Sequence, residues 1–128
     1  MKRLCVNCWQ LEQKCCCGNR KIEMVDKNII DILTVLNRKG YKTRFSCGGH
    51  IEKSFIFIYV YFDNDYVFPD GLPNKFSYKK KILYYRNGKV KTKREKQKEI
   101  NKKILILKDW VERLSFYIEK NNAKRKKG

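Results

Sequence analysis

Apolar and polar positions recur with two different periods along the chain, and this separates the predicted helices from the predicted strands. Apolar residues three and four positions apart predict a first amphipathic helix over residues 25–36. Asp26 can cap its start, and Gly40 can end it. The apolar face of this helix consists of Val25, Ile29, Ile32, Leu33 and Leu36.

Two strands are predicted after this helix. Residues 41–46 alternate, with Tyr41, Thr43 and Phe45 expected on one face of the strand. Residues 55–62 are apolar on both faces, so we expect them at the centre of a sheet that helices cover on at least one side. The short connection between the two strands favours an antiparallel pair.

The second half of the chain predicts a loop, a hairpin and a long helix. Both prolines lie in residues 63–75, which predict the loop, and Asn87-Gly88 predicts a type I′ hairpin turn between residues 82–86 and 89–92. Thr92 and Glu95 form a capping box that starts the helix. Its apolar stripe, which Trp110 widens, consists of Ile100, Ile104, Leu107, Val111, Leu114 and Ile118.

Strands and helices do not alternate as in a parallel sheet, so the order of elements predicts an α+β fold. We expect a small antiparallel sheet packed by two helices, with an N-terminal zinc-knuckle loop. The 128 residues then divide into a zinc knuckle over residues 1–20, an α+β domain over 21–120 and a disordered basic tail over 121–128.

No secretory signal and no apolar run long enough to span a membrane is evident, so we expect a cytoplasmic protein whose cysteines are thiols or metal ligands.

The cysteine spacing predicts a structural zinc site. A Cys-x-x-Cys step followed closely by a cysteine triplet can supply a tetrahedral set of thiolates. The expected ligands are Cys5, Cys8, Cys15 and Cys17, with Cys16 pointing away.

The net charge of +18 is concentrated in the C-terminal part of the chain. Residues 1–74 hold 11 Lys/Arg and 8 Asp/Glu, a net of +3, whereas residues 75–128 hold 20 and 5, a net of +15. This asymmetry predicts a polyanionic partner, although a compositional bias toward Lys, Asn and Ile is an alternative explanation. The candidate nucleic-acid contacts are Lys79, Lys80, Lys81, Tyr84, Lys89, Lys91, Lys93, Arg94, Lys98 and Lys102. Tyr78 and Tyr85 are interleaved with this charge, and either Tyr84 or Tyr85 should point inward.

The segment Ser46-Cys47-Gly48-Gly49-His50 allows four interpretations. Cys47 and His50 could bind a metal, either a second ion or the N-terminal one. Cys47 could be a nucleophile with His50 as its base, but no Asp or Asn is clearly placed to orient the histidine. The glycines could form a plain turn, or their N–H groups and His50 could contact a phosphate or a base.

The stretch "GYKTRFSCGGH" resembles a G-x-x-T-x-x-S-C-x-G-H signature of small proteins from Firmicutes and their phages, which often follows a Cys-rich zinc knuckle. The resemblance covers about residues 3–85 and implies a phage or mobile-element setting. Ser46-Cys47-x-Gly49 is also similar to the S-C-S-G-R motif of the wybutosine-synthesis methyltransferase family, which acts on tRNA, but His50 replaces its arginine. That similarity favours RNA over DNA as the partner.

These observations predict a small zinc-stabilised protein that binds nucleic acid through backbone contacts, with RNA preferred and with little sequence specificity. One alternative is an anti-CRISPR-like inhibitor of a host nuclease or ribonucleoprotein complex, acting in the host cytoplasm. Another is an RNA-modifying enzyme centred on Cys47 and His50. We favour a binding protein over an enzyme.

Overall fold

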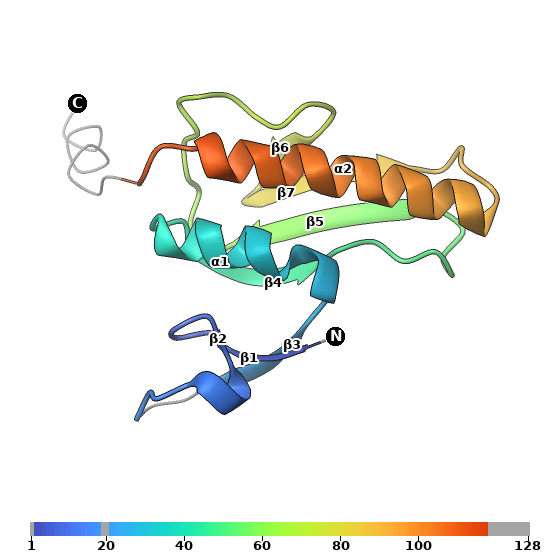
Figure 1. Ribbon diagram of the computed structural model, residues 1–128. Helices are drawn as coiled ribbons and strands as arrows, with labels where there is room; N and C mark the ends of the chain where they lie inside the picture. The colour runs from blue at the N-terminus through green and yellow to red at the C-terminus, as the bar shows by residue number, and fades with distance from the viewer. Residues whose placement is uncertain (1, 19–20, 118–128) are drawn as a thin grey trace.

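The computed structural model describes residues 2–18 and 21–117 and shows an α+β fold (Figure 1). Its larger sheet is antiparallel and has the strand order β4-β5-β7-β6. The strands of this sheet are β4 (Thr43–Cys47), β5 (Ile56–Phe62), β6 (Ser77–Lys79) and β7 (Ile82–Asn87). β5 is therefore an inner strand paired antiparallel with β4, as its sequence predicts.

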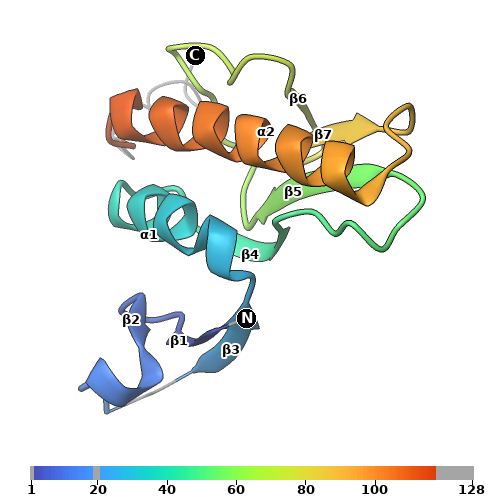
Figure 2. The ribbon, with the colours of Figure 1, turned by 45° about the vertical axis from the view of Figure 1, so that its right-hand side comes forward.

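Both helices lie on the same face of this sheet (Figures 1 and 2), and the core lies between them and the strands. They are α1 (Ile30–Arg38) and α2 (Lys93–Arg113). Alternate residues of β5 point into this core and are fully buried, namely Ile56, Ile58, Val60 and Phe62. The predicted stripe of α2 packs on them, with Ile100, Leu107, Trp110, Val111 and Leu114 buried and Ile104 partly buried.

The N-terminal segment forms a second antiparallel sheet, which was predicted only as a loop. It has the order β2-β1-β3 and lies beside the edge strand β4 (Figure 1). Its strands are β1 (Lys2–Cys5), β2 (Gln10–Leu11) and β3 (Ile22–Val25), with the 3-10 turn η1 (Glu12–Lys14) after β2. Leu4, Trp9 and Val25 are buried and join the main core.

The first helix starts later than predicted. Val25 ends β3, a 3-10 turn η2 (Lys27–Ile29) follows, and α1 begins at Ile30. The Asp26 side chain does not cap this turn, because its Oδ2 accepts a hydrogen bond from the distant Gly48 N–H instead (2.8 Å). The predicted termination at Gly40 is confirmed: its φ is +97°, and the next N–H, of Tyr41, bonds back to the carbonyl of Leu36 at 2.9 Å.

The predicted facing of the strand after α1 is wrong because β4 contains an irregularity between Thr43 and Phe45. Thr43 pairs with the inward-facing Phe62, whereas Phe45 pairs with Tyr61. Tyr41 is buried, and Phe45 is 59% exposed. A bulge of this kind moves later side chains to the opposite face of the sheet.

The predicted hairpin at Asn87-Gly88 is also wrong. Gly88 does not have the positive φ of a type I′ turn, and Asn87 Oδ1 accepts a hydrogen bond from the Lys89 N–H at 2.9 Å, an Asx-type turn that leads toward α2. The hairpin instead joins β6 to β7, and the residues of its two-residue turn, Lys80 and Lys81, have φ of 52° and 69°. Positive φ at both positions is the type I′ conformation, which lysine rarely adopts.

α2 begins and ends at well-defined caps. The Thr92 hydroxyl accepts from the Glu95 N–H at 3.1 Å, which confirms the predicted N-cap. The Glu95 carboxylate accepts from the Thr92 hydroxyl at 2.8 Å, in place of the backbone N–H that completes a capping box. At the other end, Lys39 Nζ donates to the carbonyls of Val111, Glu112 and Leu114 at 2.6–2.9 Å. Residues 63–75 form the predicted loop, whereas Ile118 and the predicted tail at 121–128 lie outside the described residues.

Within residues 2–18 and 21–117, neither helix combines the length and the apolar character that crossing a membrane requires.

Candidate functional site

The structure brings together the four cysteines that the spacing predicted. Cys5 ends β1, Cys8 lies in the turn after it, and Cys15 and Cys17 follow η1. The four sulfur atoms all lie within 4.8 Å of one another, so this group could hold one metal ion. Cys16 is exposed and is not part of the group, as expected for a neighbour that points the other way.

Hydrogen bonds from the backbone and among the thiols shift the pKa values of Cys5 and Cys17 in opposite directions. Hydrogen bonds from the backbone, of which that from Lys21 is the strongest and those from Cys8 and Asn7 are weaker, outweigh burial and lower the pKa of Cys5 to about 6. Hydrogen bonds with the thiols of Cys8 and Cys15 raise the pKa of Cys17 to about 12. A divalent cation replaces such shared protons and lets all four thiolates form, so metal binding here releases protons.

Four protein ligands leave no open coordination position, which is the arrangement of a structural metal site rather than a catalytic one. The site joins the end of β1 to the segment that leads into β3. A metal ion would therefore close the small N-terminal sheet, whose strands are too short to be stable alone.

Cys47 and His50 form a separate cluster with a residue that the sequence did not connect to them. Cys47 ends β4, His50 lies in the following loop, and Asp26 lies between β3 and η2. The Asp26 Oδ2 and His50 Nε2 atoms are 3.7 Å apart. The sequence did not single out Asp26 as the acidic neighbour of His50, because a contact across 24 residues of sequence has no local signal.

The electrostatics of Cys47 do not favour a nucleophile. Burial raises the pKa of the Cys47 thiol, and the adjacent Asp26 carboxylate raises it further. A reactive cysteine needs the opposite shift, toward the thiolate at neutral pH. The interpretation in which Cys47 attacks a substrate is therefore the weakest of the four.

The predicted basic contacts to nucleic acid lie at three places, namely the β6–β7 turn, the segment after β7 and the helix α2. Lys79, Lys80 and Lys81 lie at the β6–β7 turn, at the start of β7, whereas Lys89 and Lys91 follow its other end. The exposed α2 residues Lys93, Arg94, Lys98 and Lys102 belong to a helix that covers one face of the sheet, so they point away from the strands. These residues do not line one groove.

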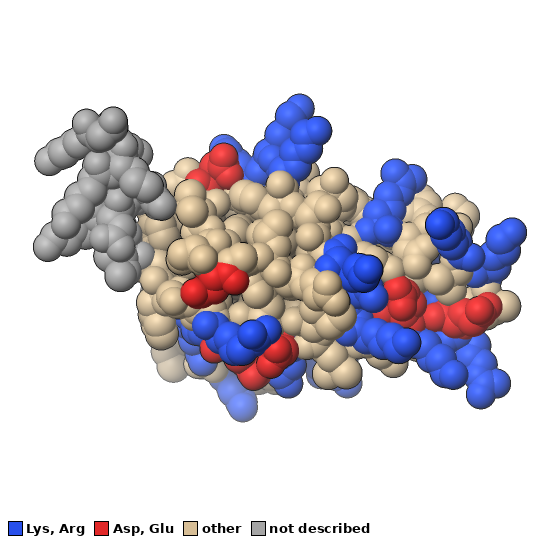
Figure 3. Space-filling view, turned by 90° about the horizontal axis from the view of Figure 1, so that it is seen from above, with Lys and Arg blue, Asp and Glu red and all other residues tan. Residues whose placement is uncertain are grey.

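Basic side chains gather at the end of the molecule where α2 begins, with few acidic ones among them (Figure 3).

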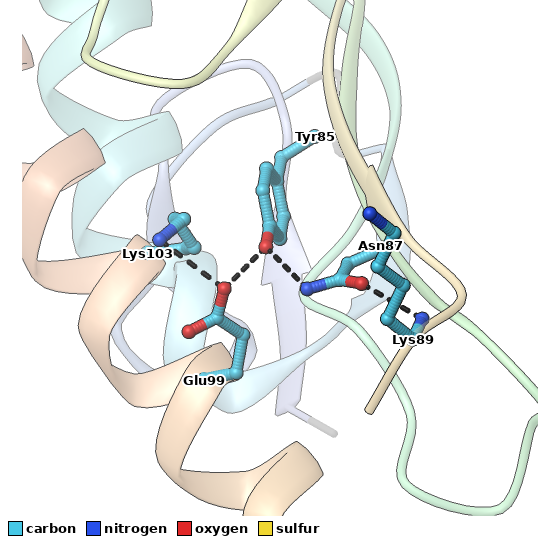
Figure 4. Close-up of polar contacts among 5 residues, drawn as sticks. All are labelled: Tyr85, Asn87, Lys89, Glu99 and Lys103. Carbon is cyan, nitrogen blue, oxygen red and sulfur yellow. Dashed lines mark hydrogen bonds and ion pairs between the residues drawn. The ribbon is translucent and has the colours of Figure 1, made fainter. Parts of the chain in front are cut away.

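An internal network of polar contacts joins α2 to β7 (Figure 4). The Tyr85 hydroxyl donates to Glu99 and accepts from Asn87 Nδ2 at 3.0 Å, and Lys103 Nζ lies 3.2 Å from Glu99 Oε2. Lys103 is buried and also lies over the Tyr85 ring, so its charge is used within the fold.

The face of the sheet opposite the helices is lined with aromatic rings, and we call it the aromatic face. It consists of Phe45 on β4, Phe57, Tyr59 and Tyr61 on β5, and Tyr84 on β7. Tyr84 points to this face while Tyr85 is buried, as predicted for one of the pair. Tyr78, by contrast, packs in the core against Phe62 and Phe68.

The rings of the aromatic face contact one another across strands. Tyr59 lies directly opposite Tyr84, and Tyr61 opposite Phe45. Centroids are 5.1 Å apart for Phe57 and Tyr59, 6.1 Å for Phe57 and Tyr84, and 5.9 Å for Phe45 and Tyr61. These contacts form two groups of rings on one face, Phe57 with Tyr59 and Tyr84, and Phe45 with Tyr61.

The charge on this sheet has one sign. None of the residues in β4, β5, β6 and β7 is acidic, whereas Arg44, Lys79 and Arg86 are basic. The Arg86 guanidinium carbon lies 4.6 Å from the Phe55 ring centroid, and that of Arg44 lies 5.9 Å from the Phe45 centroid. The sequence prediction missed the aromatic face, although the alternation of Phe and Tyr with Ile and Val in residues 56–62 was its signal.

The four-cysteine cluster yields a test that separates Cys17 from its neighbour Cys16. Titration with Co²⁺ as a probe should give the intense absorption of a tetrathiolate site in the wild type and in Cys16→Ser. Cys17→Ser should weaken metal binding at this site by at least about a hundredfold. The four ligands together supply about 10–16 kcal/mol of binding free energy, and the variant loses one of them. Equal loss in both variants, or loss in Cys16→Ser alone, would contradict the ligand set.

Comparison with known proteins gives no match to a family model, a curated protein or a solved structure. The resemblance of residues 40–50 to the Firmicutes and phage signature therefore stays a prediction.

Proposed function

We propose that this protein binds single-stranded nucleic acid, with RNA preferred, on the aromatic face of its four-stranded sheet. The observation that carries this proposal is the combination of five aromatic rings on one face of the sheet with basic side chains and no acidic residue in the strands that form it. Proteins that bind single strands combine such stacking platforms with positive charge along the backbone path.

The rings of the aromatic face are accessible to different degrees: Phe45 is exposed, whereas the other four are partly buried. The core is closed by the aliphatic positions of β5 together with the helices, and Phe45 remains 59% exposed. A base that stacks on an exposed ring gains about 1–3 kcal/mol, and the gain depends little on base identity. A groove of about 340 Å³ also opens between β3 and β4, with Met24, Phe45 and Tyr59 among its lining residues.

The basic residues provide a path for the phosphates across the sheet. Ser77 of β6 pairs with Tyr84, so its side chain lies on the aromatic face. Lys79 is two residues further along the same strand and therefore projects from that face as well. Arg86 lies opposite Phe57 near the other end of β7. A strand that crosses the aromatic face would meet a cation near each end of β7 and rings between them, which favours backbone contacts and low sequence specificity.

The strained backbone of the β6–β7 turn also supports a role of its lysines in binding. Lys80 and Lys81 both adopt positive φ, which costs about 1–3 kcal/mol for each residue other than glycine. An Asn-Gly turn would fit this geometry without that cost. Lysines at this turn are explained if their charge contributes to binding.

Zinc is the metal that we propose for the four-cysteine site. A closed tetrahedral set of thiolates selects zinc or an iron–sulfur cluster and excludes magnesium and calcium, which prefer oxygen ligands. The role of the ion in this proposal is to stabilise the N-terminal sheet that flanks the aromatic face. The ion takes no part in binding the nucleic acid.

Leucine substitutions on the aromatic face test stacking directly. In fluorescence polarisation with a labelled oligo(U) strand, Phe45→Leu and Tyr59→Leu should each weaken binding by roughly 5- to 100-fold, because each loses a stacking ring worth about 1–3 kcal/mol. The matched control is Phe116→Leu, since Phe116 is 65% exposed but lies after α2. If the face variants and the control bind equally well, the aromatic face is not the contact surface. Binding only to a host nuclease complex would support the inhibitor hypothesis instead.

Replacing the strained turn tests whether its lysines serve binding. The variant Lys80→Asn/Lys81→Gly should unfold at higher urea concentration, with a gain of about 1 kcal/mol or more in the free energy of unfolding. It should also bind oligo(U) more weakly. The slope of log affinity against log salt concentration should fall by about one to two, as expected when one to two phosphate contacts are lost. Lys98→Gln/Lys102→Gln removes the same charge from the exposed face of α2 and should reduce binding less. A larger loss in the α2 variant would place the contact on the helices.

A further inference from the structure

Asp26, Cys47 and His50 converge from two segments that are distant in the sequence. One possible metal-donor atom from each residue lies within 4.8 Å of the other two. Ligand atoms about 2.0–2.3 Å from a tetrahedral zinc ion lie roughly 3.5 Å from one another, so a small side-chain adjustment would bring all three to one ion. The His50 Nε2 to Asp26 Oδ2 separation, 3.7 Å, already has this value.

The arrangement differs from that of a catalytic cysteine triad. In a triad, the carboxylate and the nucleophile bond to opposite nitrogens of the imidazole, which keeps their reacting atoms about 7 Å apart. Here the carboxylate oxygen and the sulfur lie within 4.8 Å of each other, and the three atoms form a triangle. A triangle of donors surrounds a point, which is what an ion requires.

The two glycines hold this triangle in place. The Gly48 N–H donates to Asp26 Oδ2 at 2.8 Å, and Asn28 Nδ2 donates to the Gly48 carbonyl at 3.0 Å. A Cβ on Gly48 would lie 1.9 Å from Asn28 Oδ1, so only glycine permits this approach. Gly49 has a φ of +89° and packs against Ile100 of α2. The loop that carries the histidine is therefore fixed to both Asp26 and α2.

The cluster is open on one side. The His50 side chain is 40% exposed, whereas that of Asp26 is 13% exposed. A groove of about 550 Å³ adjoins both residues, and Asn28, Glu52, Gln97 and Ile100 also line it. An ion bound by the three donors would have its fourth position directed to this groove.

We infer that Asp26, Cys47 and His50 form a second metal site, separate from the four-cysteine site, which takes a zinc-like divalent cation with one exchangeable position. Mixed Cys, His and carboxylate donors suit such an ion, and three protein ligands with an open position are the arrangement of catalytic rather than structural zinc. The open position would take water or an anionic oxygen. Binding of nucleic acid to the aromatic face is not required for this site.

Metal stoichiometry tests the second site without reference to activity. Purified protein saturated with Zn²⁺ and freed of excess metal should hold two kinds of ion, one retained strongly by the thiolate cluster and one released by a mild chelator. His50→Gln should hold one ion fewer per chain, because the substitution removes a ligand at a partly exposed position. Cys16→Ser is the control and should match the wild type.

Cobalt spectra distinguish loss of the site from loss of the fold. In His50→Gln and in Cys47→Ser, the tetrathiolate absorption of the first site should persist while the weaker bands of the second site disappear. A wild-type protein that binds cobalt only at the tetrathiolate site would overturn the inference. A second ion retained in both variants would overturn it as well.

Discussion

Strand β5 imposes the constraint from which the rest of the architecture follows. Its aliphatic residues and Phe62 point to one side and are fully buried, and both helices pack on that side. Its other side carries Phe57, Tyr59 and Tyr61, and neither helix of the described residues covers it. One face of the sheet is therefore closed by the fold, and the opposite face is left as a surface of rings available to a ligand.

The two clusters of possible metal ligands lie near the edge of this sheet formed by β4. β3 leads from the four-cysteine cluster to Asp26, and Asp26 holds the loop after β4 through the Gly48 N–H. Cys47 lies opposite Tyr59 in the strand register, and burial together with the charges of Cys47 and Asp26 raises the pKa of Tyr59. Folding of the N-terminal sheet is thus connected physically to the loop of His50 and to one ring of the aromatic face.

Features with a local cause could be predicted from the sequence, and features that depend on distant contacts could not. The Gly40 terminator, the Thr92 N-cap and the cysteine spacing each act within a few residues, and the structure contains all three arrangements. The hairpin was misplaced because Lys80 and Lys81 adopt a turn conformation that lysine disfavours, while Asn87 is engaged by Tyr85 and Lys89. The bulge in β4 and the contact of Asp26 with His50 have no counterpart in local patterns.

The central claim is that bases stack on the aromatic face, and the most direct measurement is an NMR titration of labelled protein with single-stranded oligo(U). We predict that the ring resonances of Phe45, Phe57, Tyr59, Tyr61 and Tyr84 shift upon binding, while amides around Lys98 and Lys102 on the opposite side change little. Shifts confined to α2, or no shifts on the aromatic face at saturation, would contradict it.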